Sequence, residues 1–278
     1  MKWMLGFCWL LACSSPMGAP TPGDDAGGLS DAAGIADAGT EPVDGAAADK
    51  GGAPLTPGTS TIDLTVAGKM RTAILYVPAA AGAGPLPLVI ALHGNGDTNT
   101  NFVAATRLTA RADAAPFVLV APQGIPQQLL GTTLSWDAYH SVAEGNIDEP
   151  LLDALRARLV ASSSVDEKRV FVFGYSQGGY MSFRYGMDTA AALSCAGVLA
   201  AAAPTSDPQL VTGAARKIAV ALQIGTLDFA IDAARATRAT LISNGNPLNY
   251  NEIAGAGHVP IPGDLQTPLD FCLAQRLP

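Results

Sequence analysis

The feature that most restricts the fold is a series of continuous apolar runs that each lead into a glycine. Three of them are LPLVIALHG (86–94), FVLVAPQG (117–124) and RVFVFGYSQG (169–178). Such runs are typical of strands that are buried on both faces of a parallel sheet. Segments with helical spacing separate the runs, as in residues 147–163. This alternation predicts an α/β fold with a mainly parallel sheet between helices, and functional residues just after the strands.

The N-terminal residues 1–12, MKWMLGFCWLLA, contain one lysine followed by an apolar run. The run is too short for a permanent membrane-spanning helix and is typical of an export signal. Its end, LLAC, resembles the bacterial lipobox, which predicts a lipid on Cys13 and a place in the cell envelope, at the outer membrane. The alternative is an ordinary secretory leader cut near Ala19 and a freely secreted protein.

Residues 13–58 are rich in Ala, Gly, Pro and Asp and contain no aromatic residue. Such a segment cannot bury enough apolar surface to offset the entropy of ordering, so we expect a disordered, acidic tether. Residues 14–58 carry −6 of the net charge of −8, and nothing indicates a basic nucleic-acid-binding surface. The remaining residues 59–278 are numerous enough for one domain with a substantial core.

One glycine-rich turn has the pattern G-x-S-x-G, from Gly174 to Gly178 around Ser176. A strand that turns sharply into a helix needs small residues beside the turn, and the serine hydroxyl then projects above the sheet. The apolar VFVF before the turn and the helix-compatible GYMSFRYG after it supply this context. Ser176 is therefore the candidate nucleophile.

A serine nucleophile needs a base and a carboxylate that orients the base. Proteins with this turn usually carry the acid and then the histidine after the serine, and His258 is the only one of three histidines that follows Ser176. Asp228 comes directly after the apolar run IAVALQIG, so it is the candidate acid. Asp232 is the alternative, although its position is typical of a carboxylate in the first turn of a helix.

The oxyanion of a tetrahedral intermediate needs two backbone N–H donors. One is expected from Gln177, the residue after the serine. The other is expected from the glycine-containing loop HGNGD, at Asn95 or alternatively at Gly94. His93 either supports this loop from behind or is a polar residue at a strand end without influence on catalysis.

These motifs resemble those of serine esterases with the α/β-hydrolase fold, in particular the polyhydroxybutyrate-depolymerase and feruloyl-esterase-like group. The matching stretches are HGNGD, APQGI, SWDA, VDEKRVFVFGYSQGGYMSF, IGTLD and GAGHVPIPG. The resemblance extends from about residue 61 to residue 278 and implies the same triad. Two positions depart from it: Val259 stands where many members have Trp, and Glu149 where many have a second Asp.

The resemblance implies a carboxylic ester hydrolase that works through an acyl-enzyme, without a metal or organic cofactor, on a small or polymeric ester. It places Trp136 near the substrate, and we also expect Tyr175 to contact the substrate. Trp136 and Tyr139 could form an aromatic wall, or Trp136 could simply pack beneath its loop. The alternative functions are a serine peptidase on the same fold and a tethered binding module without catalysis.

Two cysteines, Cys195 and Cys272, lie within the expected domain. In an oxidising compartment they could form a disulfide. As buried thiols they would behave as small hydrophobic residues. The sequence leaves both possibilities open, and no Cys-x-x-Cys or His-rich cluster predicts a metal site.

Overall fold

The computed structural model describes residues 52–126, 133–205, 208–260 and 264–278. The expected signal peptide, the proposed lipidation site Cys13 and most of the expected tether lie outside the described residues. The domain begins earlier than we expected. The Ser163 N–H donates to the Gly52 carbonyl over 3.0 Å, and the Leu55 N–H donates to Ser164 Oγ over 2.9 Å. Because these backbone groups have partners in the domain, the tether does not extend to residue 58.

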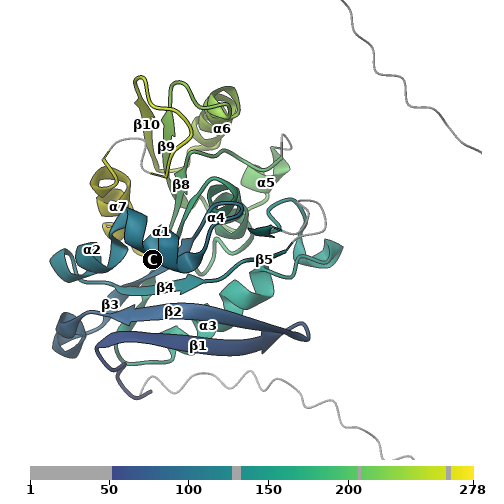
Figure 1. The fold of residues 1–278 in the computed structure, drawn as a ribbon. Helices are drawn as coiled ribbons and strands as arrows, with labels where there is room; N and C mark the ends of the chain where they lie inside the picture. The colour runs from purple at the N-terminus through teal and green to yellow at the C-terminus, as the bar shows by residue number, and fades with distance from the viewer. Residues whose placement is uncertain (1–51, 127–132, 206–207, 261–263) are drawn as a thin grey trace, which may run out of the picture. The chain divides into compact units, whose positions relative to one another are not determined.

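The central sheet has eight strands in the order β1-β2-β4-β3-β7-β8-β9-β10, and it confirms the mainly parallel sheet that we expected (Figure 1). The pairs β1–β2 and β2–β4 are antiparallel, and all the other pairs are parallel. The strands are β1 (Gly58–Val66), β2 (Lys69–Val77), β3 (Leu86–Leu92), β4 (Val118–Pro122), β7 (Val165–Tyr175), β8 (Cys195–Leu199), β9 (Ala219–Gly225) and β10 (Leu248–Ile253).

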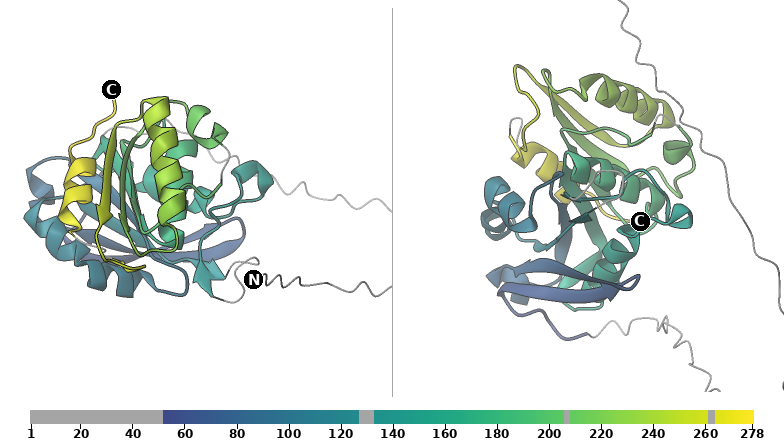
Figure 2. Two further views of the ribbon diagram at one scale, coloured as in Figure 1. Left: turned by 90° about the horizontal axis from the view of Figure 1, so that it is seen from above. Right: turned by 45° about the vertical axis from the view of Figure 1, so that its right-hand side comes forward.

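Helices cover both faces of this sheet, as Figure 2 shows. Alternate residues of one strand point to opposite faces, so Leu88 and Ile90 of β3 belong to one core and Val89 and Ala91 to the other. The first core contains residues of α3 (Glu149–Val160), α4 (Gln177–Asp188), α5 (Gln209–Thr212) and α6 (Ile231–Asn244). The second contains residues of α1 (Asn99–Thr106), α2 (Leu108–Ala114) and α7 (Gln266–Leu273).

The short elements that complete the description are η1 (Ala79–Ala83), β5 (Ile125–Pro126), β6 (Leu134–Ser135) and η3 (Val142–Glu144). Residues 102–115 have helical spacing in the sequence, but the structure divides them into α1 and α2 at Arg107, whose φ is 53°. Six residues of continuous helix would turn Leu108 about 120° away from Phe102. The break allows both side chains to be buried in the same core. None of the described helices is long and apolar enough to cross a membrane.

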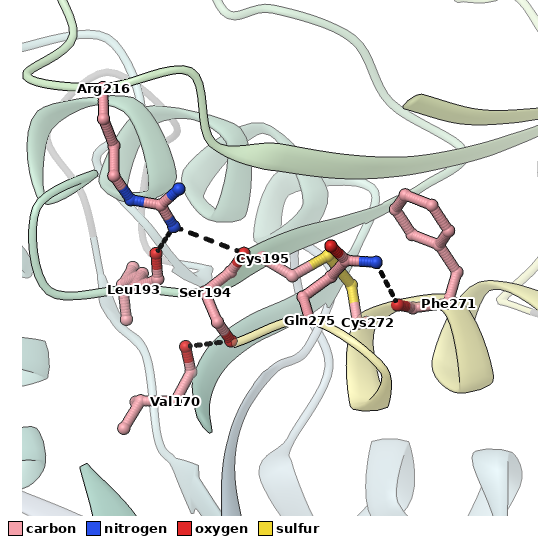
Figure 3. The surroundings of a disulfide bond; sticks show 8 residues. All are labelled: Val170, Leu193, Ser194, Cys195, Arg216, Phe271, Cys272 and Gln275. Atoms are coloured by element: carbon pink, nitrogen blue, oxygen red, sulfur yellow. Dashed lines mark hydrogen bonds between the residues drawn. A yellow bond between two sulfur atoms is a disulfide. The ribbon is translucent and has the colours of Figure 1, made fainter. Parts of the chain in front are cut away.

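Cys195 at the start of β8 and Cys272 in α7 form a disulfide, which answers the question that the sequence left open (Figure 3). Their Cα atoms are 5.3 Å apart, although 77 positions separate them in the chain. Both residues are fully buried in the second core. The bond therefore ties the last helix to the centre of the sheet.

Candidate active site

The three candidate catalytic residues follow the carboxyl ends of three parallel strands. Ser176 comes directly after β7, Asp228 follows β9, and His258 follows β10. Parallel strands end at the same edge of a sheet, and β8 lies between β7 and β9. The fold therefore brings together residues that are up to 82 positions apart in the chain.

The side chains of these residues form a continuous hydrogen-bonded chain. His258 Nε2 lies 2.8 Å from Ser176 Oγ, and His258 Nδ1 lies 2.8 Å from Asp228 Oδ2. The Asp228 carboxylate is fully buried, and its second oxygen accepts the Ala230 N–H over 2.9 Å. A carboxylate accepts the proton of Nδ1, so Nε2 is left to accept the serine proton. The alternative acid, Asp232, is 94% exposed and lies 3.6 Å from Arg235.

The turn at Ser176 has a conformation that few residues adopt. The φ of Ser176 is 52° and its ψ is −120°, a sparsely populated backbone region. A Cβ on Gly178 would lie 2.3 Å from the Leu92 carbonyl oxygen, and one on Gly174 would lie 2.2 Å from the Gly178 oxygen. These close approaches explain why the turn needs glycine on both sides of the serine. The Ser176 N–H donates to the Leu199 carbonyl over 2.9 Å and ties the turn to β8.

The loops that carry Asp228 and His258 are bound to each other. The Leu227 N–H donates to the Ala256 carbonyl over 2.9 Å, and the Gly255 N–H donates to Thr226 Oγ1 over 2.9 Å. A Cβ on Gly225 would lie 2.1 Å from the Ala256 oxygen, so only glycine permits this approach. These contacts fix the position of the histidine loop relative to the acid.

His93 supports the loop after β3 from a fully buried position. The Gly124 N–H donates to His93 Nε2 over 2.9 Å, so this nitrogen is an acceptor. The proton is then on Nδ1, which donates to the Gly94 carbonyl over 2.7 Å. Burial lowers the pKa of His93 below its ordinary value and favours this neutral form. His93 thus has the supporting position that we expected.

The two expected oxyanion donors are in segments next to Ser176 in the chain or in space. Gln177 is the first residue of α4, where backbone N–H groups have no partner within the helix. A Cβ on Gly94 would lie 3.5 Å from Ser176 Cβ, so the backbone that leads into Asn95 passes close to the nucleophile. The Asn95 side-chain Oδ1 accepts from Thr133 Oγ1 over 3.0 Å. The assignment of the two amides stays a prediction.

The expected contact between Trp136 and the substrate is wrong. Trp136 is fully buried, and its Nε1 donates to the His93 carbonyl over 2.8 Å. The adjacent Asp137 N–H donates over 2.8 Å to Asp148, whose carboxylate forms a buried ion pair with Arg71. The indole packs beneath its loop because its N–H finds an acceptor in the protein interior, which was the second interpretation of the sequence.

Tyr175 packs against the candidate base. Its ring centroid lies 5.3 Å from that of His258, and its hydroxyl donates to the His258 carbonyl over 3.3 Å. Burial, followed by the charges of Asp228 and Asp97, raises the pKa of Tyr175 above its ordinary value, so the hydroxyl stays a donor. The contact of Tyr175 with substrate stays a prediction.

Phe229 is a neighbour of the triad that the sequence reasoning missed. Its ring centroid lies 4.5 Å from that of His258, and the side chain is 77% exposed. An aromatic residue directly after the candidate acid was the available signal.

Among the residues that the structure describes, no group of three or more His, Cys, Asp or Glu side chains could hold a metal ion.

Residues 79–272, more than half of the chain, match the model of the phospholipase and carboxylesterase family. The chain belongs to this family. A Nocardia uniformis protein that is named as an esterase is 29% identical over 134 residues, or 47% of this chain and 38% of that protein. Feruloyl esterase B of Neurospora crassa is 32% identical over 108 residues, or 38% of this chain and 36% of that protein. The matches thus span little more than a third of these relatives.

Solved structures share the fold of this family member at low sequence identity. A ferulic acid esterase has a TM-score of 0.60 and 16% identity, with 78% of this chain and 96% of that chain covered. An S-formylglutathione hydrolase from Agrobacterium tumefaciens has a TM-score of 0.62 and 17% identity, with 81% and 100% covered. These likenesses establish the α/β-hydrolase fold.

Proposed function

We propose that this protein hydrolyses carboxylic esters by serine catalysis through an acyl-enzyme. The observation that carries the proposal is the pair of 2.8 Å contacts that His258 makes, one with Ser176 Oγ and one with Asp228. A nucleophile, a base and a carboxylate in this arrangement can activate a hydroxyl that is otherwise a weak nucleophile. Membership of the phospholipase and carboxylesterase family supports the choice of an ester as substrate.

The reaction has two halves. In the first, Ser176 Oγ attacks the ester carbonyl while His258 Nε2 takes the hydroxyl proton, and the Gln177 and Asn95 amides donate to the oxyanion. The carbon–oxygen bond to the alcohol then breaks, and the alcohol oxygen takes the proton from Nε2. In the second half, His258 deprotonates a water that attacks the acyl-enzyme, and the carboxylic acid leaves as Ser176 recovers its proton. Asp228 stabilises the imidazolium in both halves.

Within this class we propose a feruloyl-esterase-like or polyhydroxybutyrate-depolymerase-like activity. The motifs around Ser176, Asp228 and His258 support it, as does the name of the Neurospora crassa relative. A further relative, from Neocallimastix patriciarum, is named as a bifunctional acetylxylan esterase and xylanase and is 30% identical over 139 residues, 49% of this chain and 18% of that protein. Simple acetyl, feruloyl and 3-hydroxybutyrate esters therefore form the first substrate panel.

A fluorophosphonate probe tests the nucleophile directly. We expect the probe to label the protein covalently on Ser176, because only an activated serine attacks phosphorus at a useful rate. Mass spectrometry of the labelled peptide identifies the residue, and an ester panel with a parallel peptide panel identifies the reaction. Labelling elsewhere, or cleavage of peptides without turnover of any ester, contradicts the proposal.

We also propose that the protein is exported and anchored by a lipid on Cys13. The LLAC motif supports the anchor, and the Cys195–Cys272 disulfide supports an oxidising compartment. Expression in a bacterial host with radiolabelled palmitate should label the wild type and not a Cys13→Ser variant. Equal labelling of the two chains contradicts the anchor.

A further inference from the structure

Exposed apolar side chains stand next in sequence to two members of the candidate triad, Asp228 and His258. Seven large apolar side chains are exposed in the described part of the chain, and three of these are in the loops that carry Asp228 and His258. They are Leu227, Phe229 and Val259, with exposed fractions of 73%, 77% and 42%. We call these three residues the apolar rim. Isolated apolar side chains at a surface are ordinary, whereas a group of them beside a reactive site indicates a binding surface.

The position of Phe229 in this rim is fixed by the turn that presents the acid. The Asp228 N–H donates to the Gly225 carbonyl over 3.1 Å, and the Asp228 side chain accepts from Ala230 over 2.9 Å. Phe229 lies between these two anchors. Its ring is inclined by 40° to the His258 imidazole at a centroid distance of 4.5 Å. One part of the ring thus contacts the base, and most of the rest faces solvent.

The chemistry decides which part of an ester comes near this ring. The proton that His258 Nε2 receives from Ser176 passes to the alcohol oxygen, so this oxygen must lie about 3 Å from Nε2. The carbon atoms attached to it are therefore beside the imidazole. The acyl group instead remains bonded to Ser176 Oγ after the alcohol has left. The exposed part of Phe229 is thus placed to contact the alcohol portion.

We propose that the apolar rim is the subsite for the alcohol portion of the ester, and that Phe229 favours alcohols with an apolar or aromatic group. The inference rests on the proposed function. It supplies, from a different loop, the aromatic contact that the buried Trp136 cannot make. Apolar contact area between ring and alcohol would be removed from water in the transition state, which favours such esters over those of small alcohols.

The test compares benzyl acetate with methyl acetate. Both esters give the same acetyl-enzyme. An equal change in kcat/KM for the two esters therefore reports on His258 or on the acyl side, whereas a change in the ratio of their kcat/KM values reports on the alcohol subsite. For Phe229→Ala we expect the benzyl-to-methyl ratio of kcat/KM to fall roughly tenfold, as for the loss of a few apolar groups from a pocket. Phe229→Trp should retain most of the ratio.

Met70→Ala is the matched control, because Met70 lies in β2 and is also 77% exposed. It should leave the ratio as it is in the wild type. An equal fall for both esters in Phe229→Ala overturns the inference and shows that Phe229 only positions His258. An unchanged benzyl-to-methyl ratio in Phe229→Ala also overturns it. So does a Phe229→Ala variant whose kcat/KM changes more among methyl esters of different acids than between benzyl and methyl acetate. A wild type that hydrolyses neither ester and is not labelled at Ser176 contradicts the proposed function itself.

Discussion

A Ser176→Ala variant should lose about a millionfold in kcat on a p-nitrophenyl ester, the scale found when the serine of such a triad is removed. Ser176 Oγ is the atom that forms the acyl-enzyme, and it lies 2.8 Å from His258 Nε2, which takes the hydroxyl proton. What remains is the catalysis supplied by substrate binding and by the backbone donors near Gln177. Steady-state turnover, measured with enzyme that is free of host esterases, gives the comparison.

Further variants show whether the three residues act as a unit. His258→Ala should cost about as much as Ser176→Ala, and the double variant should cost little more than either. Asp228→Asn should cost about 10⁴-fold, because the amide favours the wrong imidazole tautomer. Ser163→Ala, at an exposed serine just before β7 and so at the opposite end of that strand from Ser176, should keep wild-type turnover. A Ser176→Ala variant with more than a hundredth of wild-type activity contradicts the triad. So does a double variant whose loss in kcat equals the product of the losses in Ser176→Ala and His258→Ala.

Removal of the disulfide should have the largest effect on stability. A Cys195→Ala/Cys272→Ala double variant is expected to lose about 4 kcal/mol of the free energy of unfolding, from the entropy of a loop of this length in the unfolded chain. The bond spans 77 positions and joins β8 to α7. Urea unfolding of the oxidised wild type and of the double variant gives the difference.

Reduction of the wild type provides the matched control for this stability effect. A reductant should lower the stability of the wild type towards that of the double variant and should not change the double variant. The denatured wild-type chain should also titrate with two more thiols after reduction than before. An equal thiol count before and after reduction, or equal stability of wild type and double variant, contradicts the bond.

The sequence alone determined the parts of this protein that depend on local pattern. The apolar runs predicted the buried parallel strands, because a strand covered on both faces must be apolar along its length. The spacing of Gly174, Ser176 and Gly178 predicted the sharp turn, because only glycine permits approaches of 2.2 and 2.3 Å from a Cβ position to neighbouring carbonyl oxygens. Chain order then placed Asp228 and His258 at the same edge of the sheet.

Other features depend on which distant group a side chain meets, and only the tertiary structure decided them. Trp136 is an equally plausible substrate contact until the His93 carbonyl is found 2.8 Å from its indole nitrogen. Phe229 gains its meaning from His258, which is 29 positions away in the chain and 4.5 Å away in space. Cys195 and Cys272 are paired because α7 packs against β8. Orientation and pairing of side chains arise from packing between remote segments, and a linear pattern of residues does not encode them locally.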